Sequence, residues 1–538
     1  MNLPQTMNNN LWYKNAVFYE ISVRAYKDSN GDGHGDLAGL TQKLDYLKTL
    51  GIDCIWIMPI YPSPLKDDGY DIADYYAVDS TFGSMQDLED LIAAAHQREI
   101  RIVMDLVLNH TSDQHPWFQA SRSSRTSPYR QYYVWSDTDQ RYQDARIIFT
   151  DTEPSNWTYD EDSGQYYWHR FYASQPDLNF DHPAVQEEML NVARFWLDKG
   201  IDGFRADAVP YLFEREGTNC ENLPETHVYL KTLRAFMDAH YPGRILLCEA
   251  NQWPEDVRPY FGDGDEFHIG FHFPIMPRIY MALKKGEYSD IADIMRRTPA
   301  IPENCQWCTF LRNHDELTLE MVTEDERQWM WQEYAPEPRM KLNLGIRRRL
   351  APLMDFDHRK IELANSLLFT LPGSPIIYYG DEIGMGDNLD LPDRNGVRTP
   401  MQWDATRHAG FTNGTPYSAF ATGQASYERI NVASQMKDPN SLFSSLQKMI
   451  AIRKQHPAFA SSGMEWMDTG SPAVAGYTRS KDGETILLLN NLSEEPVSVK
   501  IPSDYLVNVL DLFSGQTFVL PMHLTLEPYS YFWFQVLA

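Results

Sequence analysis

The chain is poor in cysteine, lacks a long apolar run and carries little positive charge for its length. Only five of its 538 residues are cysteine, an odd and sparse set that argues against a disulfide framework and suits a reducing compartment. No uninterrupted apolar run of about 18 residues occurs, so we expect no transmembrane helix. The polar start of the chain, Met1 to Leu11, shows no apolar secretory core, and we therefore predict a cytoplasmic location.

Positive charge is scarce, since 47 Lys and Arg stand against 75 Asp and Glu, for a formal net charge of −28 at pH 7. Such a chain repels nucleic acid and anionic lipid, so we predict neither as a partner. Aromatic residues are plentiful at 13%, which serves either large cores or stacking on the C–H faces of sugars. The sequence leaves the oligomeric state open, a homo-oligomer included.

Short β-rich runs alternate with amphipathic helical segments through most of the chain. This alternation predicts an α/β fold, a (β/α)8 TIM barrel, because parallel strands with helical crossovers close in that way. The expected strands are Ala16–Val23, Ile52–Met58, Arg101–Leu108, Ile201–Asp207, Arg244–Glu249, Phe267–His272, Gln306–Arg312 and Ser374–Gly380.

A chain of this length exceeds one ordinary domain, so we expect further pieces. The barrel should occupy 1–109 and 177–456, interrupted after its third strand by an insertion at 110–176, domain B. That insertion is rich in Tyr, Trp, Asp and Ser and shows little helical period, and loops of such length are commonly functional. A lid-like, charge-rich insertion at 316–357 follows the seventh strand. Alternating short strands at 457–538 predict a C-terminal antiparallel β-sandwich domain.

Three acids stand where expected strands end, namely Asp207, Glu249 and Asp315. Barrel enzymes place catalytic groups at that end of their strands, and glycosidic-bond chemistry needs one protonated and one ionised carboxyl group. Arg205 faces the same side of the strand as Asp207 and should keep it ionised. The apolar run before Glu249 should raise its pKa and suit it to acid/base work. His314 is a donor for sugar hydroxyls. One such acid alone could be a cap or a surface charge, whereas three in this arrangement indicate a site.

An Asp- and Gly-rich loop follows the first expected strand. Oxygen-bearing residues fall at its first, third and fifth positions with Gly at the sixth, as in a calcium loop. The Glu that closes an EF-hand at position 12 is missing, so we predict a compact calcium loop and keep an Asx-rich turn as the alternative. The expected ligands are the side chains of Asp28, Asn30, Asp32 and Asp36 and the carbonyl of His34.

The segments around the three acids resemble the signature regions of the α-amylase family of retaining α-glucosidases and transglucosylases. Gly203–Asp207 is similar to the nucleophile region, Glu249 to the acid/base, and Asn313–Asp315 to the region of the third acid. The resemblance implies double displacement through a glucosyl-enzyme on the nucleophile, with Glu249 acting first as acid and then as base. It further implies that the third acid binds two sugar hydroxyls and stabilises the oxocarbenium-like state.

The resemblance extends to substrate binding. In a segment similar to Gly69–Ile72, the family uses a tyrosine to stack on glucose and an aspartate to bind its 4-hydroxyl, which implies these roles for Tyr70 and Asp71. Arg394 lies in a segment similar to one found in exo-acting members and is the implied partner of Asp71. His110 ends a stretch similar to the first signature region. The set implies a pocket for one terminal glucose rather than a cleft for starch.

The resemblance also implies a second calcium ion between the barrel and the first insertion, and both ions would be structural. No organic cofactor is implied. The implied ligands of the second ion are the side chains of Asn109, Asp177 and Glu214 and the carbonyls of Tyr211 and Leu212.

Longer stretches, such as Glu214–His227, Glu249–Asp256 and His314–Val322, resemble the branch of this family that interconverts maltose and trehalose, and the match runs over essentially the whole chain. The implied reaction breaks the α-1,4 bond, holds glucose on Asp207, and lets the released glucose turn over and attack through its anomeric hydroxyl, with minor hydrolysis. Tyr211 and Asn251 lie just beyond two of the acids and could orient the second sugar. The alternatives are a hydrolytic exo-α-glucosidase for short malto-oligosaccharides and a non-catalytic sugar-binding protein.

Overall fold

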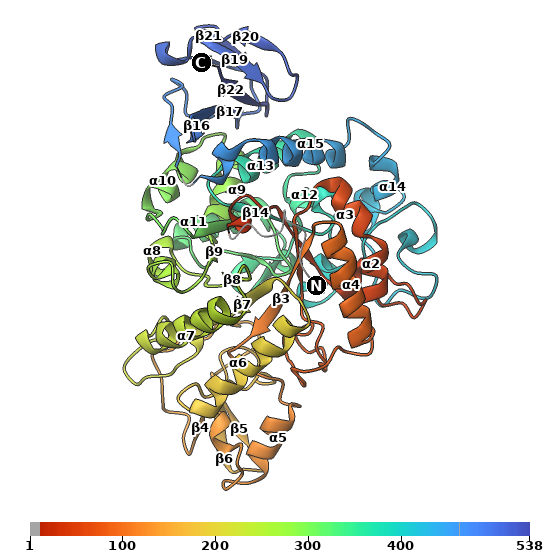
Figure 1. Ribbon diagram of the computed structural model, residues 1–538, viewed down its shortest axis with the longest axis vertical. Coiled ribbons are helices and arrows are strands. Elements are labelled where there is room, and N and C mark those ends of the chain that lie inside the picture. The colour runs from red at the N-terminus through yellow and green to blue at the C-terminus, as the bar shows by residue number, and fades with distance from the viewer. Residues whose placement is uncertain (1–10, 462, 538) are drawn as a thin grey trace.

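The structure, a computed structural model, describes residues 11–461 and 463–537, so the polar start of the chain at 1–10 lies outside it. Eight parallel strands close into a barrel in the order β1-β14-β10-β9-β8-β7-β3-β2, which confirms the expected (β/α)8 architecture (Figure 1). Each expected strand overlaps one of them. The strands are β1 (Phe18–Ile21), β2 (Cys54–Ile57), β3 (Arg101–Val107), β7 (Gly203–Asp207), β8 (Ile245–Cys248), β9 (Ile269–Phe271), β10 (Gln306–Phe310) and β14 (Ser374–Tyr378).

Helices surround the barrel and cover its outer face. Every residue of the eight strands is buried, because helices pack outside and side chains fill the interior. Capping residues next to the first turn stabilise the start of several of these helices. At the start of α4, for example, Ser84 and Asp87 form a capping box. The longer helices are α3 (Leu44–Leu50), α4 (Met85–Gln97), α6 (Pro183–Asp198), α7 (Pro224–His240), α9 (Ile275–Lys285), α10 (Ser289–Arg297), α13 (His358–Thr370) and α15 (Leu442–Gln455).

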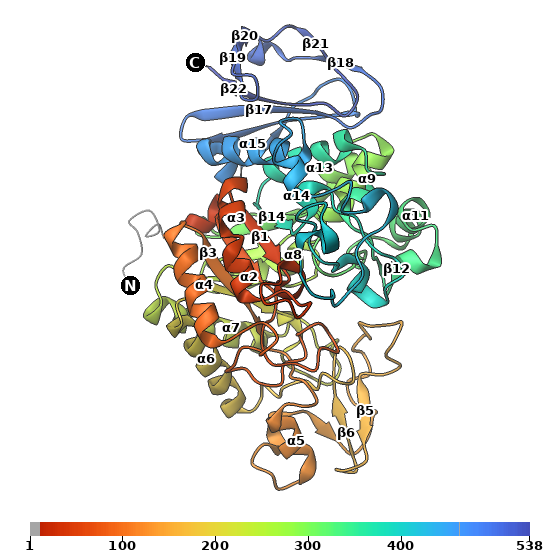
Figure 2. The same cartoon turned by 90° about the vertical axis from the view of Figure 1, so that its right-hand side faces the viewer.

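The insertion after β3 forms a small unit of its own at one end of the molecule (Figures 1 and 2). It contains the helix α5 (Pro116–Ser123), which the weak helical period of the segment did not predict. It also contains a three-stranded antiparallel sheet in the order β4-β6-β5. These strands are β4 (Trp135–Ser136), β5 (Trp157–Asp160) and β6 (Gln165–Trp168). Trp157 and Trp168 pack in a small apolar cluster that also includes Cys220, from the segment after β7.

The segment after β10 forms a second compact insertion. Its helix α11 (Glu324–Tyr334) begins directly after Thr323, because Thr323 and Glu326 form a capping box there. A three-stranded sheet in the order β11-β13-β12 lies beside the helix. The remaining elements are β11 (Leu317–Thr318), β12 (Lys341–Leu342), β13 (Gly345–Ile346) and α12 (Leu350–Leu353).

The C-terminal segment forms the expected antiparallel β-domain, with a six-stranded sheet in the order β15-β16-β17-β22-β19-β20 and a two-stranded sheet β18-β21. It packs on α13 and α15 at the end of the molecule opposite to the first insertion (Figure 2). Trp533 donates to the Ser366 hydroxyl at 2.9 Å across this junction. The strands are β15 (Glu465–Trp466), β16 (Val474–Lys481), β17 (Glu484–Asn491), β18 (Val497–Lys500), β19 (Asn508–Asp511), β20 (Thr517–Val519), β21 (His523–Leu526) and β22 (Tyr531–Val536).

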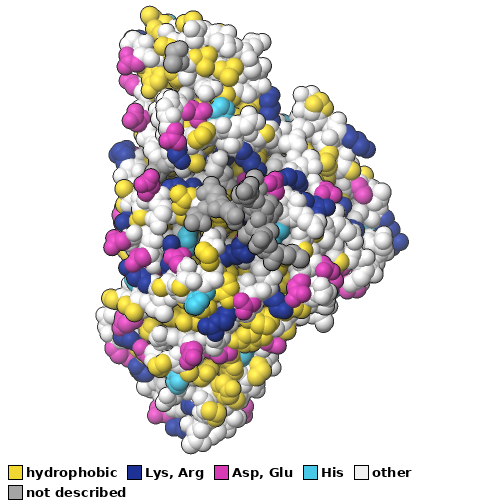
Figure 3. Space-filling view, viewed as in Figure 1, with side chains coloured by type: hydrophobic (Ala, Val, Ile, Leu, Met, Phe, Trp, Pro, Cys, Tyr) yellow, Lys and Arg dark blue, Asp and Glu magenta, His cyan; other side chains and the backbone are white. Residues whose placement is uncertain are grey.

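The surface mixes charges of both signs. Figure 3 shows acidic and basic side chains interspersed over the face in view, without a large patch of one sign. All five cysteines are buried and free. Among the helices that the structure describes, none has the length and apolar character needed to cross a membrane.

Candidate active site

A cavity opens at the C-terminal ends of the barrel strands, with an empty volume of about 870 Å³ when its open mouth is included. This is the position at which barrel enzymes build their sites. The cavity brings together the three predicted acids and most of the predicted substrate residues. Its lining includes Asp67, Tyr70, His110, Phe149, Phe171, Asp207, Tyr211, Glu249, Asn251, His314, Asp315, Glu316, Glu320 and Arg394.

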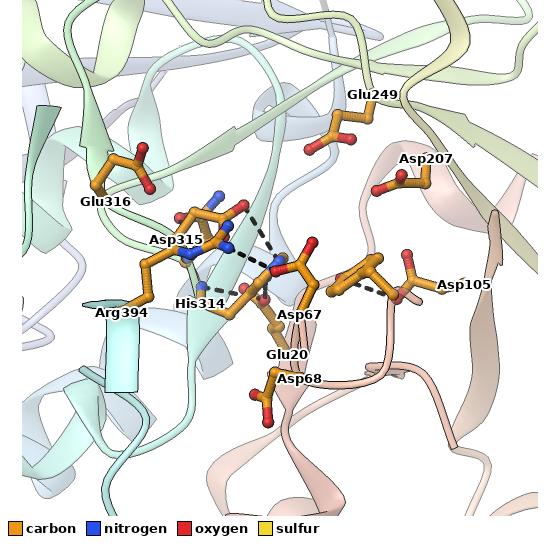
Figure 4. Close-up of polar contacts among 12 residues, drawn as sticks. Glu20, Asp67, Asp68, Asp105, Asp207, Glu249, His314, Asp315, Glu316 and Arg394 are labelled. Atoms are coloured by element: carbon orange, nitrogen blue, oxygen red, sulfur yellow. Dashed lines mark hydrogen bonds and ion pairs between the residues drawn. The ribbon is translucent and has the colours of Figure 1, made fainter. Parts of the chain in front are cut away.

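Arg205 lies at the centre of the acidic cluster and is almost fully buried. Its Nη1 atom is 2.5 Å from Asp207 Oδ1 and 2.7 Å from Asp105 Oδ1, while Nη2 contacts Glu249 Oε1. Asp207 is the last residue of β7, and Glu249 directly follows β8. Adjacent parallel strands therefore deliver both acids to one guanidinium, and Figure 4 shows their carboxyl groups side by side.

Burial dominates the ionisation of Asp207 and Glu249. It raises the pKa of Asp207 to about 6, although Arg205 opposes the shift. The expected effect of Arg205 is present but smaller than the cost of burial. Burial raises the pKa of Glu249 to about 8, again against Arg205, as the apolar run before it predicts. At neutral pH the pair therefore holds one proton, mainly on Glu249.

Asp315 lies in the loop after β10 and meets three cationic or donor groups. Its Oδ1 accepts from Arg394 Nη1 at 2.8 Å and from Arg398 Nη2 at 3.0 Å, and its Oδ2 is 3.2 Å from His314 Nε2. Burial opposes ionisation, but His314, Arg394 and Arg398 together lower the pKa of Asp315. Asp315 is thus the acid that stays ionised most firmly.

Asp71 is not a cavity residue, and the predicted Arg394–Asp71 pair is wrong. Asp71 is fully buried, and its carboxylate accepts from the Ser63 hydroxyl and from two backbone N–H groups of its own loop at 2.9–3.0 Å. Arg394 Nη2 instead lies 2.5 Å from Asp67 Oδ1, as Figure 4 shows. Asp67 lines the cavity and also accepts from Gln175 at 3.0 Å.

Tyr70 and His110 line the same end of the cavity. The ring of Tyr70 stacks on His314 with centroids 5.2 Å apart and an interplanar angle of 12°. Burial lowers the pKa of His110 to about 3, so its imidazole is neutral, and its Nε2 lies 3.2 Å from the Gln175 amide nitrogen. Aromatic faces and neutral donors of this kind suit an uncharged sugar.

Tyr211 and Asn251 also line the cavity. Asn251 donates to the Thr318 hydroxyl at 3.2 Å, while its buried Oδ1 has no partner among the residues that the structure describes. The Tyr211 hydroxyl accepts from Arg146 Nη2 at 3.2 Å. A buried carbonyl oxygen without a donor is costly, so Asn251 is poised to accept from a ligand hydroxyl.

The two insertions meet over the cavity. Arg146, from the first insertion, pairs with Glu320 of the second at 2.9 Å and with Glu221 at 2.8 Å. A second link joins the Asn343 backbone N–H to Asp151 Oδ2 at 2.8 Å. We call these contacts the roof. Both insertions were candidates for a lid from the sequence, but the individual residue pairs of the roof were not predicted, because they lie in irregular segments far apart in the chain.

The predicted calcium loop lies before α2 (Leu37–Gln42), and its oxygens already have partners. Asp28 accepts three backbone N–H groups of the loop at 2.7–3.0 Å. Asp36 accepts hydrogen bonds from the backbone N–H and the hydroxyl of Ser29. The Asn30 side chain accepts from the Asp32 N–H, and the Asp32 side chain accepts from the His34 N–H. Within 11–461 and 463–537, no group of three or more His, Cys, Asp or Glu is arranged to hold a metal. Calcium in this loop stays a prediction.

The second predicted ligand set fits a hard cation better. Asn109 Oδ1, Asp177 Oδ2 and Glu214 Oε1 are buried, and none of the three has a hydrogen-bond partner within the described part of the chain. Burial raises the pKa of Asp177. Burial also raises the pKa of Glu214, and the negative charge of Asp177 raises it further. Tyr211 and Leu212, whose carbonyls are the remaining expected ligands, come shortly before Glu214. Orphaned carboxylate and amide oxygens are the donors that calcium prefers.

The fold and the cavity together identify the class of protein. It is a (β/α)8-barrel enzyme whose site, at the carboxyl ends of the strands, combines acidic and aromatic residues as sugar-binding sites do. Comparison with known families agrees. Residues 20–462 match the α-amylase catalytic domain, and residues 464–533 match the C-terminal domain of maltogenic amylase. The chain belongs to the α-amylase family.

Individual relatives match over nearly the whole chain. It is 54% identical to a trehalose synthase/amylase of Mycobacterium tuberculosis, covering 98% of this chain and 90% of that protein. It is 53% identical to a trehalose synthase of Pimelobacter, covering 98% and 96%. A crystal structure of the trehalulose synthase of Pseudomonas mesoacidophila superposes with a TM-score of 0.80 at 31% identity, covering 98% of this chain and 99% of that one.

Proposed function

We propose that this enzyme interconverts maltose and trehalose by intramolecular transglucosylation, with minor hydrolysis to glucose. The observation that carries the proposal is a cavity with three acids at its floor and a roof joining two insertions above it. The names of two relatives at 53–54% identity support the same reaction.

The proposed first step is attack on the terminal glucose. Asp207 attacks the anomeric carbon while Glu249 protonates the glycosidic oxygen, so the α-1,4 bond breaks and a β-glucosyl ester forms. Asp315 binds hydroxyls of this glucose and stabilises the positive charge at the ring. Asp207 and Glu249 contact the same guanidinium of Arg205. That spacing favours retention, since inverting enzymes hold a water between more distant acids.

The proposed second step reuses the released glucose. It stays in the cavity, turns over, and gives its anomeric hydroxyl proton to Glu249 as that oxygen attacks the ester, which forms the α,α-1,1 bond and frees Asp207. Tyr211, Asn251 and Glu316 line the cavity and are proposed to orient the second sugar. Asp67 and Arg394 are proposed to close the pocket behind the non-reducing end, which limits it to one glucose.

Product analysis on maltose tests the proposal against the hydrolytic exo-α-glucosidase. The purified enzyme should convert maltose mainly to trehalose and should form maltose from trehalose, because the bound glucose has a large effective concentration over water. Carbon-13 NMR of the reaction follows all three sugars directly. Mainly glucose from both disaccharides would rule out the isomerase.

The ionisation of the two central acids predicts a bell-shaped pH dependence of kcat/KM. Activity should fall below about pH 6, where Asp207 takes up a proton, and above about pH 8, where Glu249 loses one. The two values belong to the coupled pair. Glu249→Gln, assayed on α-glucosyl fluoride, which needs no acid for departure, should keep the acid limb and lose the alkaline one. An alkaline limb that persists in this variant would contradict the assignment.

Opening the roof should favour water over glucose as acceptor. Arg146→Ala removes the link between Glu320 and Glu221, and we expect the ratio of glucose to trehalose to rise roughly tenfold. Arg141→Ala is the matched control, since Arg141 belongs to the same insertion but pairs with Glu216 rather than with a residue of the second insertion. If both variants gave the same ratio of glucose to trehalose, the roof would not be what excludes water.

We propose that calcium binds through Asn109, Asp177 and Glu214, and, from the sequence alone, in the loop that carries Asp28. Both ions would be structural. Exhaustive chelation should lower the thermal midpoint by several degrees, and added calcium should restore it, because a cation bound only to the folded state stabilises it. Asp177→Asn should abolish most of that calcium response. A thermal midpoint unaffected by chelation and dialysis would refute both sites.

A cytoplasmic location, without nucleic-acid or membrane partners, remains our proposal from composition. Cell fractionation of the producing organism tests it.

A further inference from the structure

Glu20 lies beneath the cavity, near the carboxyl end of β1, and contacts His314 of the active site. Its side chain is fully buried. Glu20 Oε1 is 2.5 Å from His314 Nδ1 and also accepts the His314 backbone N–H at 3.3 Å. Figure 4 shows Glu20 beside His314, joined to it by a dashed line. Glu20 Oε2 has no hydrogen-bond partner in the part of the chain that the structure describes.

These surroundings disfavour a negative charge on Glu20. An ionised carboxylate is stabilised by donors on both oxygens, and leaving one bare in a fully buried site costs much more free energy than leaving a neutral carbonyl bare. Burial raises the pKa of Glu20 well above its usual value; Arg205 opposes this, and Asp315 and Asp105 reinforce it. A buried carboxyl group kept neutral in this way can serve as a hydrogen-bond donor at neutral pH.

The surroundings of the other ring nitrogen, Nε2, determine which nitrogen of His314 carries the proton. His314 Nε2 lies 3.2 Å from Asp315 Oδ2, and Asp315 is the most firmly ionised of the three acids. A bare Nε2 lone pair would repel that carboxylate, whereas an Nε2–H attracts it. Burial lowers the pKa of His314 well below its usual value, so the ring carries one proton. That proton belongs on Nε2, which leaves Nδ1 as an acceptor.

We propose that Glu20 is a positioning residue, a neutral acid that donates to His314 Nδ1 and thereby holds the His314 Nε2–H towards Asp315 and the bound sugar. The Tyr70 ring, stacked on the imidazole with an interplanar angle of 12°, fixes the ring plane, and Glu20 fixes its protonation. The inference deepens the proposed glucosyl transfer and rests on it for its kinetic consequence, but not for the proton positions.

Glutamine and methionine at position 20 form a matched pair of similar size. In Glu20→Gln the amide N–H replaces the acid O–H, so kcat should stay within about threefold of wild type. Glu20→Met has no donor, and kcat should fall by about 100-fold, the loss typical of a positioned hydrogen bond, with a smaller change in KM. Release of nitrophenol from 4-nitrophenyl α-glucoside measures glucosyl transfer whether or not isomerisation occurs. Equal kcat values in Gln and Met variants of equal thermal midpoint would overturn the proposal.

Neutron crystallography of the unmodified enzyme tests the proton positions without any variant. We expect deuterium on Glu20 between Oε1 and Nδ1, and on His314 Nε2. Deuterium on Nδ1 with a bare Nε2 would overturn the proposal even if both variants failed to fold. Because this result does not depend on the substrate, it separates failure of the inference from failure of the proposed function.

Discussion

Replacing Asp207 with alanine should reduce the conversion of maltose by at least about 10⁵-fold, the scale on which loss of a nucleophile is felt in enzymes of covalent mechanism. Without its carboxylate no glucosyl ester forms, and the trehalose bond has no intermediate from which to be made. Initial rates from sensitive trehalose and glucose assays measure the loss. A thermal midpoint near that of wild type would show that the fold survives.

Azide then distinguishes the roles of the two central acids by stereochemistry. In Asp207→Ala, azide fills the space of the carboxylate, attacks α-glucosyl fluoride from the β face and should give β-glucosyl azide. In Glu249→Ala the ester still forms on Asp207, and azide should attack it from the opposite face to give α-glucosyl azide. The two variants are thus controls for each other. Azide products of the same configuration from both variants would contradict the assignment of nucleophile and acid/base.

The barrel and its acids were predictable because they depend on local pattern. Apolar β-rich runs alternating with helices predict the strands, and an acid at the end of a strand such as β7 lies at the functional rim in any such barrel. Arg205 was predictable for the same reason, since residues i and i+2 of a strand share a face. What could not be predicted was the balance between its charge and burial, which depends on the depth of Asp207 in the folded site.

The roof and the closed end of the pocket were not predictable from local pattern. Arg146 and Glu320 come from separate insertions without periodic signals, and their contact exists only once both have folded over the barrel. Asp67 and Asp71 lie in one irregular loop, and nothing in their spacing tells which carboxylate faces the cavity. The choice follows from hydrogen bonding: the loop's own backbone N–H groups need an acceptor, and Asp71 is the residue that supplies it.

The same substitution at these two neighbouring aspartates should therefore have different consequences. Asp67→Asn removes the charge that faces Arg394 at 2.5 Å, in the buried end of the cavity where we propose that the terminal glucose binds. We expect kcat/KM for maltose to fall by roughly 10²- to 10³-fold, since neutralising one partner of a buried charge pair costs about 3–4 kcal/mol. The measurement is the initial rate of maltose consumption at concentrations well below KM.

Asp71→Asn is the matched control, with the same loss of charge in the same loop. Its amide retains one acceptor oxygen but turns a donor towards a backbone N–H, so the free energy of unfolding should fall by about 1–2 kcal/mol. The kcat/KM should stay within about fivefold of wild type, because Asp71 does not line the cavity. Denaturant titration and maltose kinetics on both variants separate the two effects. If Asp71→Asn lost more activity than Asp67→Asn at equal folded fraction, Asp71 would have to contact the sugar after all, and the pocket would need a conformation in which its carboxylate leaves the loop backbone.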